Sequence, residues 1–204
     1  MEFLSHPSLT DNQKKGIAMN LFCKRLLVTA FMMAVALPLL AHDVKSEDEL
    51  IADMSSPKAK TVTSALQDME KQYPTSVPGI AKAKSLLTDD RLAVREKAAR
   101  VLGAIHADVS DADLDNIAKL LDGPGKDEII EGLKALRGLK AQSTVPKIVP
   151  LLKNPEANVK RDACRTLAVL ADKSVVPDIQ PLLQDPDKAV VKDASDAIFT
   201  LNNK

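Results

Sequence analysis

The chain has 204 residues, with 28 basic and 28 acidic side chains, so its formal net charge at pH 7 is zero. A chain without net positive charge lacks the field that holds a polyanion, and an aromatic content of 2% leaves few rings on which bases could stack. These two properties exclude a nucleic-acid-binding function.

The first predicted element is an export signal in residues 1–41. The segment Leu26–Leu40 is almost continuously apolar, follows Lys24-Arg25 and ends at Ala41, before a polar stretch. This order is typical of a secretory signal peptide, and the apolar run is short for a membrane span, which needs about 20 residues. We predict cleavage after Ala41 and a periplasmic or secreted protein without stable membrane insertion. Retention of the segment as an anchor is the alternative.

The start of translation is also open, because Met19 would leave a more compact basic region before the apolar run than Met1 does. Cleavage after Ala41 would make His42 the first residue of a repeat domain spanning residues 42–204. A free amine and an imidazole on one residue can chelate copper, with His106 as the candidate second ligand. The simpler interpretation is that His42 is only a polar residue after the cleavage site, so we expect no cofactor.

Helix pairs are predicted from residue 47 onwards. Glu47–Met54 and Lys58–Gln72 form the first pair, a diverged amino-terminal cap. A second helix then follows Asp89-Asp90. Apolar residues recur in it at i, i+4, i+8 and i+11, and again in a later helix, which is the stripe of a helix with one buried face. The two stripes are Val94, Ala98, Leu102 and Ile105, and Val159, Ala163, Leu167 and Leu170.

An octet repeats in the carboxyl-terminal half. Val145–Leu152 reads VPKIVPLL, and Val176–Leu183, 31 residues later, reads VPDIQPLL. Each octet leads through an Asn-Pro or Asp-Pro turn into a second helical segment. A fixed period of this length indicates a solenoid of stacked helix–turn–helix units. The second proline of each octet, Pro150 or Pro181, should tighten the first helix because proline has no N–H to donate.

A weaker unit occupies Asp111–Gly138. Its second helix is predicted over Lys126–Gly138, with Leu136 in the position of Leu167 and Gly132 in the position of the alanine. Its first helix matches the following unit at three apolar positions, again with a spacing of 31 residues: Ile117, Leu120 and Leu121 correspond to Ile148, Leu151 and Leu152.

Helix pairs with an early proline, an Asp/Asn-Pro turn and the pattern Val-Arg/Lys-x-x-Ala-x-x-x-Leu resemble HEAT repeats, and the short period is most similar to the compact repeats first named for phycobilisome lyases. The resemblance covers Glu47–Leu201. It implies an all-α fold, a right-handed α-α solenoid of about five helix pairs, with the second helices lining the concave face. It also implies that Arg95 pairs with the turn residue Asp89 or Asp90, and that Asn154 weakens the same pairing for Lys160.

The chain lacks the motifs that carry common enzyme chemistry. We find no glycine-rich phosphate loop, no Gly-x-Ser-x-Gly, no Cys-x-x-Cys, no His-Glu-x-x-His and no His-Glu pair of the kind found in HEAT-like metal oxygenases. We therefore predict no catalytic residue, although a lyase of the phycobilisome type remains an alternative that the export signal disfavours. Cys164 is interpreted as a partly buried small residue. A reactive thiol near Arg161 and Arg165 is the alternative.

Two rows of charged side chains are predicted on the outward face of the second helices. One row reads Arg100, Lys134, Arg165, Asp196, and the next reads Lys97, Glu131, Asp162, Asp193. The basic part of the first row, Arg100, Lys134 and Arg165, is the candidate contact surface for an acidic segment of a protein partner. A merely solvated face is the alternative. The predicted function is thus that of an exported, non-catalytic protein-interaction or scaffold module.

Overall fold

The computed structural model describes residues 44–204. The predicted signal peptide, its cleavage site and His42 lie outside the described residues. Ser46–Lys204 forms one compact unit, and no strand occurs within the described range. Among the described helices, none combines the length and the apolar character that crossing a bilayer requires.

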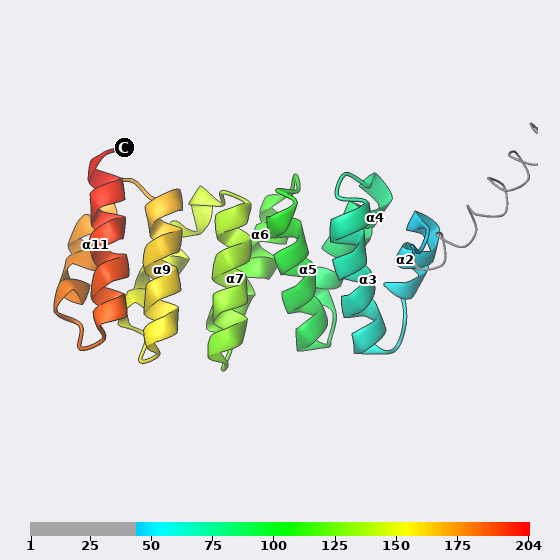
Figure 1. The fold of residues 1–204 in the computed structure, drawn as a ribbon, viewed down its shortest axis with the longest axis horizontal. Helices are drawn as coiled ribbons and strands as arrows, with labels where there is room; N and C mark the ends of the chain where they lie inside the picture. Colours follow the sequence, from blue (N-terminus) through cyan, green and yellow to red (C-terminus); the bar gives the residue numbers. More distant parts are fainter. Residues whose placement is uncertain (1–43) are drawn as a thin grey trace, which may run out of the picture. The chain divides into compact units, whose positions relative to one another are not determined.

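The described chain forms five consecutive helix pairs, and the second helices of the pairs stand side by side in one row (Figure 1). Each second helix packs against the second helices before and after it. The predicted all-α solenoid of about five helix pairs is confirmed. The pairs are α2 (Glu47–Asp53) with α3 (Ala59–Gln72), α4 (Val77–Ser85) with α5 (Leu92–Ala104), α6 (Asp111–Ala118) with α7 (Lys126–Gly138), α8 (Val145–Ile148) with α9 (Ala157–Leu170), and α10 (Val176–Ile179) with α11 (Lys188–Asn202).

The first helices of the last four pairs end in a tighter 3-10 segment: η1 (Leu86–Thr88), η2 (Lys119–Asp122), η4 (Val149–Lys153) and η6 (Gln180–Gln184). Pro150 and Pro181 lie in η4 and η6, as predicted, but η1 and η2 tighten without a proline. Proline is therefore not the common cause. What the four segments share is a pair of adjacent leucines at the end of the helix: Leu86-Leu87, Leu120-Leu121, Leu151-Leu152 and Leu182-Leu183. All of these leucines except Leu183, which is 37% exposed, lie in the core or pack against it. Two further 3-10 turns, η3 (Gln142–Thr144) and η5 (Lys173–Val175), lead into α8 and α10.

The predicted apolar stripes form the core. Val94, Ala98 and Leu102 of α5 are fully buried, as are the equivalent Val159, Ala163 and Leu167 of α9, whereas Ile105 only caps α5 and is half-buried. In α7 the small residue is Gly132. A Cβ atom there would stand 3.0 Å from Cβ of Leu120 and 3.2 Å from Cδ2 of Leu121. The glycine therefore lets α7 approach η2 more closely than alanine would.

Two second helices end in the same left-handed cap. His106 after α5 and Lys140 after α7 have φ angles of 51° and 53°. In each cap the next residue donates its N–H back to the last turn, from Ala107 to Leu102 O at 3.0 Å and from Ala141 to Leu136 O at 3.1 Å. This is the Schellman arrangement, whose left-handed position is usually glycine. His106 therefore caps the carboxyl end of α5.

Candidate functional site

The predicted basic row lies on the row of second helices, on α5, α7 and α9. The side chains of Arg100, Lys134 and Arg165 are 40%, 43% and 45% exposed. The repeat places them in equivalent positions of three successive helices, as the sequence spacing predicted. Each can therefore reach solvent and also a carboxylate of the neighbouring acidic row, which consists of Glu131, Asp162 and Asp193.

The acidic row neutralises two of these three cations at short range. Lys134 Nζ lies 2.8 Å from Glu131 Oε1 within α7, and Arg165 Nη2 lies 2.9 Å from Asp193 Oδ2 on α11. Arg100 Nε is 3.9 Å from Glu131 Oε2, which is too long for a hydrogen bond. Arg100 is therefore the least satisfied member of the row.

Two arginines of α9 converge on Asp193 of α11, whose side chain is only 8% exposed. Arg161 donates from Nε to Asp193 Oδ2 at 2.8 Å, and Arg165 donates from Nη2 to Asp193 Oδ1 at 3.2 Å. The hydrogen bond to Asp193 raises the pKa of Arg161. One unit earlier, Arg137 Nη1 lies 3.6 Å from Asp162 Oδ1. The acidic row thus joins consecutive second helices to one another.

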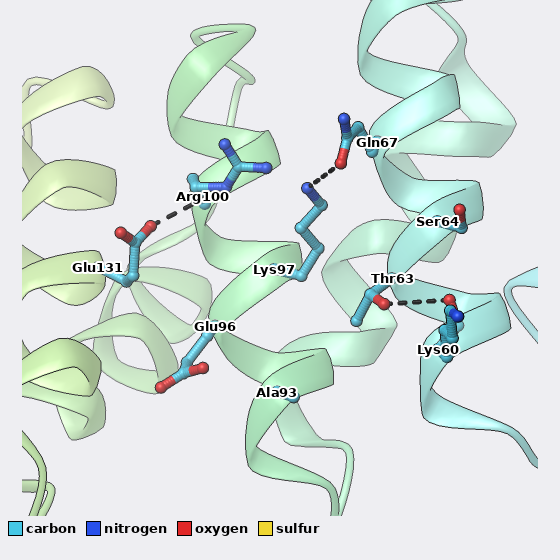
Figure 2. A pocket seen from close by; sticks show the side chains of 9 residues that line it. All are labelled: Lys60, Thr63, Ser64, Gln67, Ala93, Glu96, Lys97, Arg100 and Glu131. Atoms are coloured by element: carbon cyan, nitrogen blue, oxygen red, sulfur yellow. Dashed lines mark hydrogen bonds and ion pairs between the residues drawn. The ribbon is translucent and has the colours of Figure 1, made fainter.

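Arg100 lines an open polar groove of about 330 Å³ between α3 and α5 (Figure 2). Lys60, Ser64 and Gln67 of α3 line one side, and Lys97 and Arg100 of α5 line the other. Lys97 points toward α3 and donates to Gln67 Oε1 at 3.0 Å, a neutral acceptor. Glu96 of α5 and Glu131 of α7 line the groove as well, so its three cations share it with two carboxylates.

The charges around the groove shift two pKa values. Burial lowers the pKa of Lys97, and the neighbouring positive charge of Arg100 lowers it further. Burial raises the pKa of Glu96, and the carboxylates of Glu128 and Glu131 on α7 add to the effect. Burial is the main cause of both shifts, and neighbouring charges of the same sign add to each. A carboxylate bound between Lys97 and Arg100 would relieve the repulsion between those two cations.

The pairing expected for the turn residues differs from the observed one. The carboxylate of Asp89 accepts from Nε and Nη2 of Arg91, both at 2.7 Å, and not from Arg95. Arg95 instead donates to the backbone carbonyls of Asp89 at 2.8 Å and Asp90 at 3.1 Å. The backbone N–H of Arg91 donates to Asp89 Oδ1, closing a tight turn that places the arginine beside the carboxylate. Local turn geometry therefore decides the partner.

Lys160 likewise finds a partner that its own repeat does not supply. It forms an ion pair with Asp185, the turn residue of the following unit, and both side chains are largely buried. Asn154 of its own unit accepts from the backbone N–H of Glu156 instead, at 2.9 Å. Lys160 thus does not pair with the turn residue of its own unit, in agreement with the expected weakening, and its ion pair crosses to the next repeat instead.

The surroundings of Cys164 and His106 indicate structural roles for both residues. Cys164 is fully buried, and burial together with the nearby charge of Asp193 raises the pKa of its thiol to about 12. The interpretation as a buried small residue is confirmed, because such a thiol stays protonated. His106 Nδ1 donates to the carbonyl of Gly138 at 2.7 Å. Within residues 44–204 no group of three or more His, Cys, Asp or Glu side chains is placed to hold a metal ion.

Sequence reasoning missed the groove and the arginines that bind the acidic row. The α3 side of the groove belongs to the diverged first pair, so its residues Ser64 and Gln67 fall in no recognised repeat position. Arg137 and Arg161 stand beside the aligned rows; Lys192 lies 31 residues after Arg161, whereas Ala168 lies 31 residues after Arg137. The alternation of charges between neighbouring rows was the available signal for pairing across repeats.

Comparisons with known proteins support the repeat assignment. Residues 114–198 match the family model for HEAT repeats. No curated protein matches the chain in sequence. Among solved structures, the complex of CpcE and CpcF of phycocyanin lyase from Nostoc sp. PCC7120 is similar at 18% identity and a TM-score of 0.68, over 80% of this chain and 68% of that one.

Two further solved structures share the fold. An engineered protein is 19% identical, with a TM-score of 0.59, over 75% of this chain and 78% of its own. YibA of Escherichia coli is 16% identical, with a TM-score of 0.57, over 78% of this chain and 60% of its own. Residues 114–198 are thus HEAT repeats, and the resemblance predicted from the sequence is confirmed.

Proposed function

We propose that this protein is an exported, non-catalytic protein-interaction module that binds an acidic segment of a partner in the groove between α3 and α5. The observation that carries the proposal is the pair of cations, Lys97 and Arg100, in an open groove where neither has a carboxylate within hydrogen-bonding distance. Complementary charge of this kind guides a partner and fixes its register.

We expect one residue of the basic row to be the principal contact with the partner. Lys134 and Arg165 already have carboxylates at 2.8 Å and 2.9 Å, so a partner would have to compete with an existing ion pair at each. Arg100 has no such competitor at short range. In this proposal Arg100 is the main contact, and Lys134 and Arg165 extend the positive surface along the next two helices.

Capture of partners from the periplasmic fraction, using the immobilised protein, tests the proposal. We expect Arg100→Glu to reduce the yield of bound protein roughly tenfold or more, and single reversals at Lys134 or Arg165 to have smaller effects. All losses should shrink at high salt, because exposed charges are then screened. Lys147→Glu, on α8, is the matched control, since it reverses an exposed cation away from the groove.

A second assay uses a defined probe. A labelled peptide of glutamate and serine residues should bind the parent protein in low salt and bind the Arg100→Glu variant more weakly. If parent and variant capture the same partners in equal yield and bind the peptide equally, the groove is only a solvated surface and the proposal is wrong.

A lyase activity and copper binding are the competing functions. The likeness to CpcE and CpcF is one of fold, at an identity of 18%, and gives no residue of this chain a chemical role. The solved structure of CpcE and CpcF is a complex of two proteins, and binding to another protein is also what we propose for this chain. Absorbance and metal analysis of the purified protein separate the three: an interaction module is colourless and contains no copper.

A further inference from the structure

The groove beside Arg100 has an acidic side, formed by Glu96 of α5 and Glu131 of α7. Within residues 44–204 Glu96 makes no hydrogen bond or ion pair, and its side chain points away from α3, to the side where Glu131 lies (Figure 2). Glu131 Oε2 and Glu128 Oε2 also lack hydrogen-bond partners in this range, and Glu128 is only 6% exposed. The acidic side therefore contains acceptor oxygens that the described residues leave unfilled.

These carboxylates act on one another across the two helices. Burial is the main cause that raises the pKa of Glu96, and among the neighbouring charges Glu128 has the largest effect, followed by Glu131 and Asp127, all on α7. Arg95, on α5 itself, acts in the opposite direction and more weakly. Like charges thus face each other here, and a cation placed between them would stabilise all of them.

The same fold contains a completed version of this site between α9 and α11. There Arg161 and Arg165, four residues apart on α9, both donate to Asp193 of α11. In the aligned helices, the residues equivalent to these three are, in the same order, Glu96, Arg100 and Glu131. The α5 helix therefore has a carboxylate at the position from which α9 supplies its second guanidinium group.

We propose that the partner segment bound in the groove carries an arginine as well as an acidic residue, and that its guanidinium group pairs with Glu96 and Glu131. The inference rests on the proposed function, because it assigns a second charge to the same bound segment. Both carboxylates line the groove, so a bound side chain can reach them. A guanidinium group suits them better than an ammonium group, because its planar set of N–H donors can serve two carboxylates at once.

The two charges would fix the direction of the bound segment. Lys97 points toward α3, whereas Glu96 lies on the other side of α5 (Figure 2). The acidic residue of the partner would therefore lie on the α3 side and its arginine on the α7 side. A segment with acidic residues alone would be repelled by the acidic side of the groove, so the arrangement selects for a partner with both charges.

Peptide binding in low salt tests the arginine contact. The probes are labelled peptides of glutamate and serine residues that carry one arginine at successive positions, each compared with a peptide that has glutamine in its place. We expect at least one arginine position to bind the parent protein about tenfold more tightly than its glutamine counterpart, because hydrogen bonds between charged groups form only with the arginine. Equal affinities at every position would overturn the inference.

Two substitutions of Glu96 locate the contact. Glu96→Gln should bind both members of the peptide pair with nearly equal affinity, and it should not destabilise the fold, since it removes a carboxylate that its neighbours repel. Glu96→Arg should also lose the preference, because it places in the chain the guanidinium group that Arg161 supplies in α9. Asp115→Asn, at an exposed carboxylate of α6, is the matched control and should keep the tenfold preference. A preference that survives in Glu96→Gln would show that the arginine binds elsewhere.

The glutamine peptide separates this inference from the proposed function, since it reports the acidic contact alone. Arg100→Glu should weaken its binding. If Arg100→Glu leaves that affinity unchanged, the acidic segment does not bind in the groove and both proposals are wrong. If it weakens the binding but arginine adds nothing to the affinity of the parent protein, only the arginine contact is wrong.

Discussion

At the residue scale, the two left-handed caps differ in what their side chains add. Lys140 and His106 adopt nearly the same φ, but only His106 also donates its ring N–H to the next unit, at Gly138 O. A residue with a Cβ atom in the left-handed region lowers the stability of the fold by about 1–2 kcal/mol. Replacement by glycine restores only part of this free energy, because glycine has greater conformational freedom in the unfolded chain.

We therefore expect Lys140→Gly to stabilise the fold by about 0.5–1 kcal/mol. His106→Gly should stabilise the fold less than Lys140→Gly does, or destabilise it. The relief of backbone strain is the same, but the hydrogen bond from the histidine ring to Gly138 is lost. Urea unfolding of both variants measures the difference. A stabilisation of His106→Gly as large as that of Lys140→Gly would mean that the contact to Gly138 contributes nothing.

Asp89 makes the stability of the protein depend on acid. Hydrogen bonds from Arg91 hold the pKa of its carboxyl at about 2, below the ordinary 3.8. Because the folded-state pKa is the lower one, this carboxylate contributes its full stabilisation above the unfolded pKa and loses it as the pH falls toward the folded pKa. Asp89→Asn should therefore be less stable than the parent at neutral pH and less sensitive to acid between about pH 4 and about pH 2.

Urea midpoints measured across that pH range provide the check. Arg91→Gln should reduce the acid sensitivity in the same way, and combining it with Asp89→Asn should reduce it no further, because either change removes the same pair. If Arg91→Gln keeps the acid sensitivity of the parent, the carboxylate is stabilised by some other group.

At the element scale, the second helices pack closely through their small residues. Ala98 and Ala163 are fully buried at the centre of α5 and α9. A leucine at either position adds volume to a filled site, and overpacking costs about 1–3 kcal/mol. We expect Ala98→Leu and Ala163→Leu each to lower the urea midpoint, whereas Ala104→Leu, at an exposed position of α5, should change it little. Midpoints equal to that of the parent would contradict the packing of these helices.

The helices themselves were predictable because their signals are local and repeated. The stripes from Val94 and Val159 depend only on spacing along one helix, and the octets gave the same spacing twice. The partners of charged groups were harder to predict. Asp89 pairs with Arg91 and not with Arg95, because a tight turn places Arg91 beside its carboxylate. Lys160 forms an ion pair with Asp185 of the next unit. The first pairing depends on local turn geometry and the second on how the units stack, and the period of a sequence specifies neither.

The candidate site was predictable to the same limited degree. The position of Arg100 on the row followed from the repeat, but its partial pairing depends on the distance to Glu131, and the groove depends on α3, which departs from the repeat pattern. These are properties of the assembled solenoid and have no counterpart in a single repeat.

At the scale of the whole molecule, we predict that export removes residues 1–41. The apolar run Leu26–Leu40, preceded by basic residues, is typical of a cleaved signal. Intact mass spectrometry of the protein recovered from the periplasmic fraction should give a chain that begins at His42. A protein that remains in the membrane fraction and retains Leu26–Leu40 would show instead that the segment is an anchor.

Stability of the whole solenoid should depend on the ion pairs that join its units. A solenoid's stability is approximately the sum of the stabilities of its repeats and of the interfaces between neighbours. Asp193 of α11 accepts hydrogen bonds from two arginines of α9. Asp193→Asn removes the charge and leaves both guanidinium groups facing a neutral side chain. Hydrogen bonds to charged groups are worth about 1.5–3 kcal/mol, so we expect a destabilisation of that order.

The loss should be local to the end of the row. Hydrogen exchange of the α10 and α11 amides should accelerate in Asp193→Asn, while that of α5 and α7 stays close to the parent, because the broken interface lies between α9 and α11. Asp196→Asn is the matched control on the same helix: its pair with Lys192 is exposed on both sides and should contribute almost nothing. If the two variants are equally stable, Asp193 does not join the units. If exchange accelerates in all helices together, the solenoid unfolds as one cooperative body, and the interface between α9 and α11 supports the whole row.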